Sequence, residues 1–426
     1  MIAFSLMTLF LISVLVLSTT MQSLRETGTR HLEKLQSAIK DTDYFLIHRT
    51  LASTTQFSQS LYGNDSIKVG IEPLELSISD FSNGWGRDSC NPRMTFNTKP
   101  ENFHLYAQGV DLGQGNLSTD VEVRNGFAYL TADSAIASAP DIYIVDARNP
   151  ASSQIISSLD TGPGLSRIEV AGPYLYVANT GSTNQLQIID ISNRGAPVIR
   201  SKFKLPLPLA SSTAPATTAI FYSKGYIYIG TKKWEGSEFN IIDVSNPLAP
   251  AYIGGFDTDT LVNDIYVRDG LAYVAASDEG QMRILDVRNP VAISQIEYFS
   301  PTGWETQEGK SLSYFEGNLS LGRTTGGFNV ILNHELFTFS TTSPLTTSFS
   351  HDIPGGVYGM VMQPATLYLA TRLANKEFQI WKRDLSEKVL DFSLGFLPQT
   401  IACDGNAFYF ATGDRKGIAV LTSQSP

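Results

Sequence analysis

Four aspartates recur at the ends of similar apolar pentapeptides, at Asp146, Asp190, Asp243 and Asp286. A repeated set of carboxylates could bind calcium or line a channel. However, an asparagine follows each aspartate by three residues, and proline comes next in three of the four copies. Asx side chains bond to nearby backbone and proline fixes φ, so this pattern is typical of turns. We therefore expect the four aspartates to be structural turn residues.

Motifs that would indicate catalysis are missing from the sequence. It contains no HExxH pair, no GxSxG elbow, no P-loop and no dinucleotide fingerprint. Its five histidines are scattered, and His334 and His351 fall in ordinary strand or loop surroundings. We expect no catalytic residue, no cofactor and no metal. A secreted hydrolase or lyase with its site on scattered loops is the weaker alternative.

The composition indicates a folded, acidic protein. Hydrophobic residues make up 42% of the 426 residues and charged residues 17%, which is enough apolar material for a large core. The formal net charge is −10. Sequence-independent binding to nucleic acid needs a basic surface, so we exclude nucleic acid as a partner.

An internal repeat of strand-like segments decides the fold class. The aspartate pentapeptides belong to a series of seven apolar segments with a mean spacing of 46 residues: Ile142–Asp146, Leu186–Asp190, Phe239–Asp243, Met282–Asp286, Phe328–Leu332, Phe378–Lys382 and Ile418–Thr422. Before each lies a second apolar segment, which carries a tyrosine in six of the seven copies. A period of 40–50 residues with about four short strands is typical of a propeller blade.

The Ile-Val-Asp motif followed by Asn-Pro resembles LVIVD-repeat β-propellers, and Leu175-Tyr176-Val177-Ala178-Asn179 resembles the related YVTN type. The resemblance implies a mainly β protein with a seven-bladed β-propeller over residues 102–426. It implies nothing about chemistry, because propellers host many functions.

Closure of the ring predicts contacts between the two ends of the domain. The seventh motif leaves no room for an outer strand before Pro426, whereas Phe103–Ala107 has the character of one. We expect this N-terminal strand to complete blade seven and remove an exposed strand edge. Closure would bring Cys90 close to Cys403, which favours a disulfide and an oxidising compartment over two unrelated thiols.

The first 24 residues carry no charged side chain, and their densest apolar part is Met1–Leu17. A helix of that length spans about 26 Å, close to the thickness of a bilayer core. A signal peptide would need a basic start and a small-residue cleavage site, which are not seen. A plain anchor would place the chain in the cytoplasm, because Arg25, Arg30 and Lys34 follow the segment.

The same segment resembles the first helix of type IV pilins. Phe4-Ser5-Leu6 opens the apolar run, and the residues implied in assembly are Phe4, Leu6, Leu9, Phe10, Ile12, Val14, Leu15 and Leu17. The resemblance implies a long hydrophobic then amphipathic α-helix over residues 1–55, with an irregular linker over 56–101. It also implies that a short basic leader has been removed.

These observations predict a structural subunit of an extracellular filament. Its N-terminal helices would form a helical homopolymer, after a stage in the membrane, and the propeller would face outward to adhere to a surface ligand, glycan or protein. The alternatives are a minor tip pilin and a membrane-anchored extracytoplasmic propeller that binds a ligand or partner.

Overall fold

The structure is a computed structural model of the whole chain. It describes residues 57–60, 66–69 and 89–90, and residues 102–423 apart from 108–109, 135, 137, 163, 210–212, 302–306, 316, 326–333, 342–345 and 364. The chain divides into two compact units, Met1–Gly84 and Trp85–Pro426. In the first unit, β1 (Phe57–Ser60) pairs antiparallel with β2 (Ser66–Val69).

The expected helix over residues 1–55 lies outside the described residues, as do the eight residues implied in assembly. Among the described residues no helix is long and apolar enough to cross a membrane.

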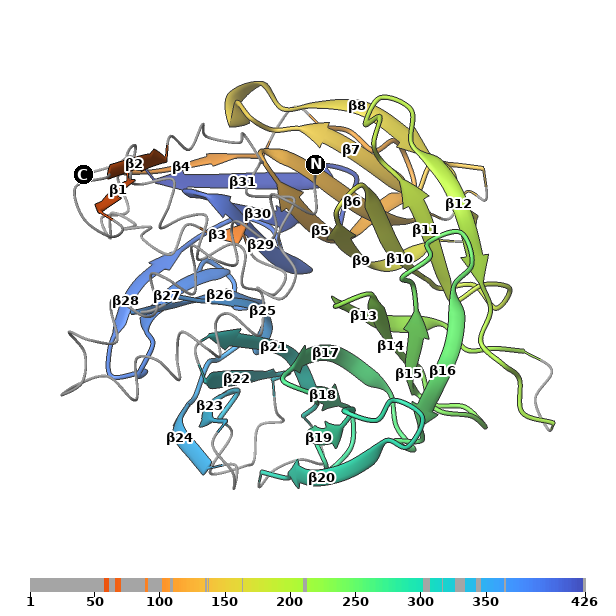
Figure 1. Cartoon of the computed structure of the whole chain (residues 1–426). Coiled ribbons are helices and arrows are strands. Elements are labelled where there is room, and N and C mark those ends of the chain that lie inside the picture. The colour runs from red at the N-terminus through yellow and green to blue at the C-terminus, as the bar shows by residue number, and fades with distance from the viewer. Residues whose placement is uncertain are drawn as a thin grey trace. The chain divides into compact units, whose positions relative to one another are not determined.

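The second unit forms a ring of seven sheets around a central axis (Figure 1). Six sheets are antiparallel four-stranded meanders, in which the chain runs from the innermost strand to the outermost. Blades one to three are β5 (Asn116–Arg124), β6 (Phe127–Ser134), β7 (Ile142–Asp146), β8 (Gln154–Leu159); β9 (Leu165–Ala171), β10 (Tyr174–Asn179), β11 (Leu186–Asp190), β12 (Val198–Phe203); β13 (Thr217–Ser223), β14 (Tyr226–Thr231), β15 (Phe239–Asp243), β16 (Ala251–Phe256).

Blades four to six follow the same plan: β17 (Val262–Arg268), β18 (Leu271–Ala276), β19 (Met282–Asp286), β20 (Ser294–Phe299); β21 (Gly309–Phe315), β22 (Asn318–Arg323), β23 (Leu336–Ser340), β24 (Thr346–His351); β25 (Val357–Met362), β26 (Thr366–Thr371), β27 (Phe378–Lys382), β28 (Lys388–Phe392). The predicted seven-bladed β-propeller is therefore confirmed.

Apolar side chains from neighbouring blades form the core. Both faces of each third strand are buried, and Phe239, Ile241, Leu285 and Phe339 are fully inaccessible within one such cluster. Each buried side chain of this size contributes about 1.5–3 kcal/mol. Neighbouring blades pack closely near the end of the second strand β14. A Cβ added to Gly230 would lie 2.3 Å from a methyl carbon of Val262 in the next blade, so only a very small residue fits there.

The N-terminal strand closes the ring, as the sequence predicts. Blade seven contains β29 (Thr400–Gly405), β30 (Ala407–Ala411) and β31 (Ile418–Ser423), and β4 (Phe103–Tyr106) pairs antiparallel with β31 as its outer strand. A short strand, β3 (Ser89–Cys90), pairs parallel with β29 on the inner edge of the same sheet. Residues from the start of the domain therefore border blade seven on both edges.

One predicted strand is wrong. The sequence analysis places the third strand of blade five at Phe328–Leu332, but the strand that pairs with β22 is β23, Leu336–Ser340. Both segments are apolar, and only the second follows a buried polar residue, Glu335, which is 2% exposed. That polar position, described below, specifies the third strand better than the apolar pattern does.

Candidate functional site

The four repeated aspartates end third strands and accept hydrogen bonds from the turns that follow. The carboxylate Oδ1 accepts from the amide nitrogen two residues on, at 3.2 Å from Arg148 to Asp146 and at 2.8 Å from Ser245 to Asp243. The matching amides are Ser192 for Asp190 and Arg288 for Asp286. These contacts fix the turn into the fourth strand and use carboxylate oxygens that a calcium ion would need.

Exposed arginines complete the environment of these turns. Arg148 pairs with Asp146 at 2.5 Å and is 64% exposed, and Arg288 pairs with Asp286. Hydrogen bonds from these arginine side chains lower the pKa of Asp146 and bring that of Asp286 to about 2. Exposed pairs of this kind contribute little to stability, because water and salt screen them. Among the described residues, no group of three or more His, Cys, Asp or Glu side chains could hold a metal ion.

The two cysteines occupy neighbouring strands. Cys90 ends β3, whose backbone pairs with Asp404 and Gly405 of β29, and Cys403 lies in β29 itself. The side chain of Cys403 is fully buried and its sulfur is disulfide-bonded. Closure of the ring thus brings the two predicted segments together.

A second repeated polar position, which the sequence analysis missed, lies one residue before each third strand. It holds Asp141, Gln185, Glu238, Gln281, Glu335 and Glu377 in blades one to six. All six side chains are at most 5% exposed. In five of the six, a side-chain oxygen accepts hydrogen bonds from the connection to the next blade, and Gln281 instead donates to the Gln307 carbonyl. We call this set the crossover clamps.

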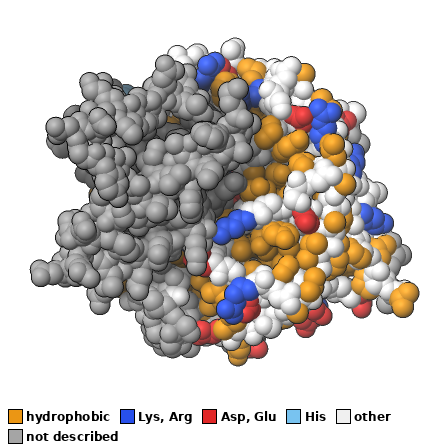
Figure 2. Space-filling model, viewed as in Figure 1, with side chains coloured by type: hydrophobic (Ala, Val, Ile, Leu, Met, Phe, Trp, Pro, Cys, Tyr) orange, Lys and Arg blue, Asp and Glu red, His pale blue; other side chains and the backbone are white. Residues whose placement is uncertain are grey.

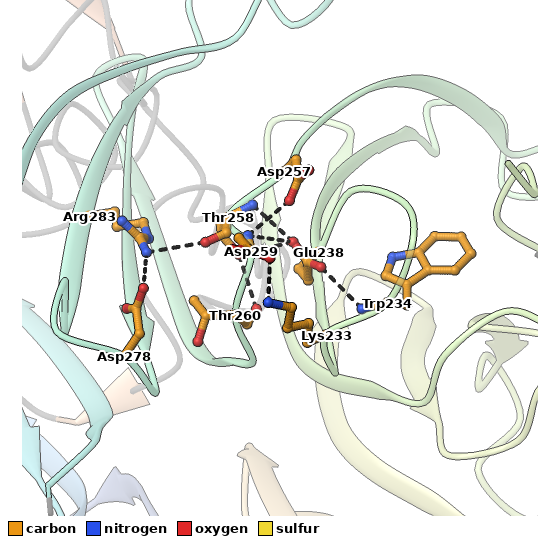
Figure 3. A network of polar contacts seen from close by, with 9 residues as sticks. All are labelled: Lys233, Trp234, Glu238, Asp257, Thr258, Asp259, Thr260, Asp278 and Arg283. Carbon is orange, nitrogen blue, oxygen red and sulfur yellow. Dashed lines mark hydrogen bonds and ion pairs between the residues drawn. The ribbon is translucent and has the colours of Figure 1, made fainter. Parts of the chain in front are cut away.

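The clamp of blade three shows the arrangement in detail (Figure 3). Glu238 Oε2 accepts from the amides of Thr258 at 2.9 Å and Asp259 at 3.1 Å, and Oε1 accepts from the amide of Trp234 at 3.2 Å. The crossover is then joined to blade four, where Arg283 donates to the Thr258 carbonyl at 3.1 Å and pairs with Asp278. One buried carboxylate therefore organises two loops and fixes the distance between two blades.

Burial raises the pKa of the acidic clamps. It raises the pKa of Asp141 to about 6, and it raises that of Glu238 as well. For Glu335, burial and a hydrogen bond shared with the Asp352 carboxyl raise the pKa to about 7. Their partners are mostly backbone amides rather than cations. They are thus unlike the turn aspartates, and their chemistry is structural.

A further set of hydrogen bonds links consecutive innermost strands. Thr119 Oγ1 donates to the Leu165 carbonyl at 2.7 Å, and Thr218 Oγ1 donates to the Val262 carbonyl at 2.5 Å. Ser166, Asn263 and Ser311 donate in the same way to the next blade. The first residues of the inner strands are therefore fixed around the axis, which makes them a rigid frame for nearby side chains.

Two basic side chains and an aromatic ring lie close together in blades five and six. Lys310 is in β21, Tyr358 is in β25, and Arg372 directly follows β26. The guanidinium of Arg372 lies 3.8 Å from the ring centroid of Tyr358, and Lys310 Nζ lies 6.0 Å from it. Lys310 donates to Asn263 Oδ1 at 3.3 Å, and Arg372 donates to Gln399 Oε1 at 3.0 Å. Lys310, Tyr358 and Arg372 are half-buried.

The surroundings of Lys310 shift the pKa of its ammonium. Burial, together with the positive charges of Arg167 and Arg372, lowers its pKa to about 8, against the opposing effects of Glu308 and Asp264. Arg167 belongs to blade two and Lys310 to blade five, three positions apart in the ring. Both residues lie in the innermost strands of their blades, β9 and β21, which border the axis. We call Arg167, Lys310 and Arg372, with Tyr358, the axial cation cluster.

Basic side chains also lie among hydrophobic ones on the outer surface. Figure 2 shows one face, on which hydrophobic side chains gather toward the middle of the described surface with Lys and Arg between them. Arginines also lie over an aromatic ring in blade one: the guanidiniums of Arg148 and Arg194 lie 4.8 and 4.5 Å from the Phe127 ring. The axial cluster differs because its three cations come from separate blades.

Spacing in the sequence could not find the axial cation cluster, since Arg167 and Arg372 are 205 positions apart. The clamps could have been found, because a polar residue directly precedes five of the seven predicted apolar motifs. The repeated tyrosines are packed side chains: Tyr129, Tyr176, Tyr273 and Tyr368 are at most 3% exposed.

Fold and site define a closed seven-bladed β-propeller with a rigid polar frame around its axis. The chain carries LVIVD repeats, matched at residues 165–204, 217–258 and 261–299, which are blades two, three and four. The predicted repeat family is confirmed for these blades. No curated protein matches the chain.

Solved propellers resemble the chain in fold. Virginiamycin B lyase from Staphylococcus aureus is 14% identical, covers 76% of this chain and all of its own, and has a TM-score of 0.54. A streptogramin B lyase is 12% identical with a TM-score of 0.54, over 76% of this chain and 99% of its own. A chain of Kuenenia stuttgartiensis hydrazine synthase is 13% identical with a TM-score of 0.56, over 74% and 97%. Identities this low show the fold alone.

Proposed function

We propose that the chain is a non-enzymatic β-propeller displayed outside the cell, and that its N-terminal apolar segment packs with its copies into the core of a type IV pilus-like filament. The observation that carries the proposal is the pairing of two unlike parts. The first 24 residues have no charge, and residues 102–423 hold a propeller that closes on itself. A closed propeller needs no help from the apolar segment to complete its core, so that segment is left for lipid or for its own copies.

The cysteines support an oxidising location. Cys403 is disulfide-bonded, and Cys90 is the other cysteine of the sequence, in a strand paired with that of Cys403. We include a Cys90–Cys403 disulfide in the proposal. Structural disulfides persist in extracytoplasmic compartments and are rare in the cytosol. Electrophoresis of denatured protein after maleimide labelling tests the bond: no label should attach until the protein is reduced.

Imaging of native surface material tests the filament. Material sheared from the cells should contain filaments with a core of bundled helices formed by Met1–Leu24 and seven-bladed rings outside. Leu15→Lys should abolish the filaments, because an unpaired charge in an apolar helix bundle is strongly unfavourable. Leu209→Lys, at a fully exposed position of the propeller, is the matched control and should leave them intact.

The second candidate is a membrane-anchored extracytoplasmic propeller that binds a ligand or partner, and the same 24 residues would then serve as an anchor. It predicts protein in the membrane fraction and none in sheared material. That result would contradict the filament, and full labelling of both cysteines without reductant would contradict the extracytoplasmic location itself.

A further inference from the structure

The axial cation cluster holds three positive charges in a protein of net charge −10. Lys310 and Arg372 lie on the same Tyr358 ring, at 6.0 and 3.8 Å from its centroid. Arg167 lies in β9, the innermost strand of blade two, and its charge adds to that of Arg372 in lowering the pKa of Lys310. Like charges brought together on a rigid frame oppose folding. Such an arrangement is retained when something else compensates it, and a bound anion is the simplest compensation.

Carboxylates of the protein offset the cluster only in part, through the effects of Glu308 and Asp264 on Lys310. None of the three cations forms an ion pair with a carboxylate in the described part of the chain. The two nearby acids are engaged elsewhere. Asp264 accepts from the amides of Ile265 at 2.9 Å and Leu312 at 2.8 Å, and Glu308 receives a long contact of 3.4 Å from Asn263.

Donors within the cluster are left unused. Nε of Arg167 and Nε of Arg372 are buried and have no hydrogen-bond partner among the described residues. The guanidinium carbon of Arg372 lies 3.8 Å from the Tyr358 ring centroid and its Nη2 donates to Gln399 Oε1, so two contacts fix the position of this group. A planar guanidinium held in this way matches an oxyanion with two parallel hydrogen bonds.

We propose that the axial cation cluster binds an oxyanion group, a carboxylate or a phosphate, carried by a small molecule or by the end of a chain. Lys310 supplies a point charge, Arg372 a guanidinium held on Tyr358, and Arg167 a further positive charge from the innermost strand of blade two. This site goes beyond the proposed function and does not depend on it, because the binding test uses purified protein and the filament test uses cell-surface material.

Binding should follow the protonation of Lys310. The pKa of its ammonium is lowered to about 8 in the presence of Arg167, Arg372, Glu308 and Asp264, with Tyr358 beside it. Affinity should therefore be constant below this pH and weaken as pH rises through it, while the arginines stay charged.

The full-length protein in detergent solution is titrated calorimetrically with sodium phosphate, sodium galacturonate and neutral galactose. Phosphate, galacturonate or both should bind, and galactose should not. Lys310→Met and Arg372→Gln should each weaken binding about tenfold or more, because each removes a charged donor. Lys232→Met removes an exposed lysine that forms no ion pair among the described residues, and this matched control should bind as the wild type does.

Melting temperature separates a binding role from a structural one. Removing a repelled charge should raise the melting temperature of Lys310→Met in ligand-free buffer and abolish the rise that phosphate causes in the wild type. A melting temperature that falls in Lys310→Met would show a structural lysine and overturn the proposal. So would equal binding of galactose, or binding of neither anion at millimolar concentration.

Discussion

In blades one and three, an acidic residue borders the third strand at each end. The two residues differ in burial and in the direction in which their pKa is shifted. In blade one, Asp141 and Asp146 border β7; in blade three, Glu238 and Asp243 border β15. Asp141 and Glu238 are fully buried, accept from backbone amides and have raised pKa values. Asp146 and Asp243 lie at the surface, where hydrogen bonds from Arg148 and Ser245 lower theirs.

This difference indicates which of the two positions contributes more to the free energy of unfolding. A buried acceptor that is removed leaves several amides without a partner, and each such amide costs about 1–3 kcal/mol. An exposed turn aspartate that is removed leaves its partners to water. The clamp, although it is the less regular residue in the sequence, should therefore matter more than the motif aspartate.

The largest effect is expected from Glu238→Ala. It leaves the amides of Trp234, Thr258 and Asp259 without their acceptor and should lower the free energy of unfolding by about 2–4 kcal/mol. Urea unfolding measures it. Glu235→Ala, at an exposed position in the same loop, should change it by less than about 0.5 kcal/mol. Equal effects of the two variants would contradict the claim that the buried clamp Glu238 stabilises the fold.

The second largest effect is expected at Gln185, the crossover clamp of blade two, whose side chain is an amide. Gln185 accepts from the Leu205 amide and also donates to the carbonyls of Gly181 and Pro215. Gln185→Glu turns both donors into repelled lone pairs, so it should cost about 1–3 kcal/mol at neutral pH. Part of the loss should be recovered at pH 5, where the carboxyl takes up a proton. A loss that is independent of pH would contradict this account.

The pH dependence of stability gives a finer test. Because the pKa of folded Glu335 is raised to about 7, the folded state holds its proton more tightly than the unfolded chain does. Its stabilising contribution is therefore present at low pH and is lost as pH rises from about 4.5 through 7. Denaturant midpoints should fall over this range. Glu335→Gln should flatten the curve, leaving the slope from Asp141, whose pKa of about 6 acts in the same direction.

The smallest effect is expected at the exposed ends. Asp190→Asn removes a carboxylate bonded to Ser192 and Arg200, and solvent screening should limit the loss to about 0.5 kcal/mol at neutral pH. The pKa of Asp190 is lowered to about 2, so this contribution should vanish only as pH falls from about 4 to 2. A change larger than that of Glu238→Ala would reverse the order of the two ends.

The sequence predicts the blades well because strand, turn and register are local properties. Ile142–Asp146 and Phe378–Lys382 match their strands, and the predicted segment Phe103–Ala107 closes the ring as β4. The wrong prediction of a strand at Phe328–Leu332 also has a local cause. The apolar pattern alone does not distinguish this segment from Leu336–Ser340, whereas the polar residue Glu335 directly before the second segment does.

The axial cation cluster lies beyond such reasoning. Arg167, Lys310 and Arg372 are ordinary surface-type residues in the sequence, and each follows a different strand pattern. Only the circular order of the blades shows that the strands of the first two both border the axis. A site of this kind is a property of ring closure, so it needs the three-dimensional arrangement.

The position of β3 has a mechanical consequence. Tension applied through residues before Ser89 reaches the propeller at β3, on the inner strand of blade seven, ahead of β4 in the chain. With Cys90 covalently joined to Cys403, the pull would pass into the buried strand β29 and by-pass the hydrogen bonds between β4 and β31. The outer strand that seals the ring would then carry no tension, and the ring would stay closed under shear flow until a covalent bond yields.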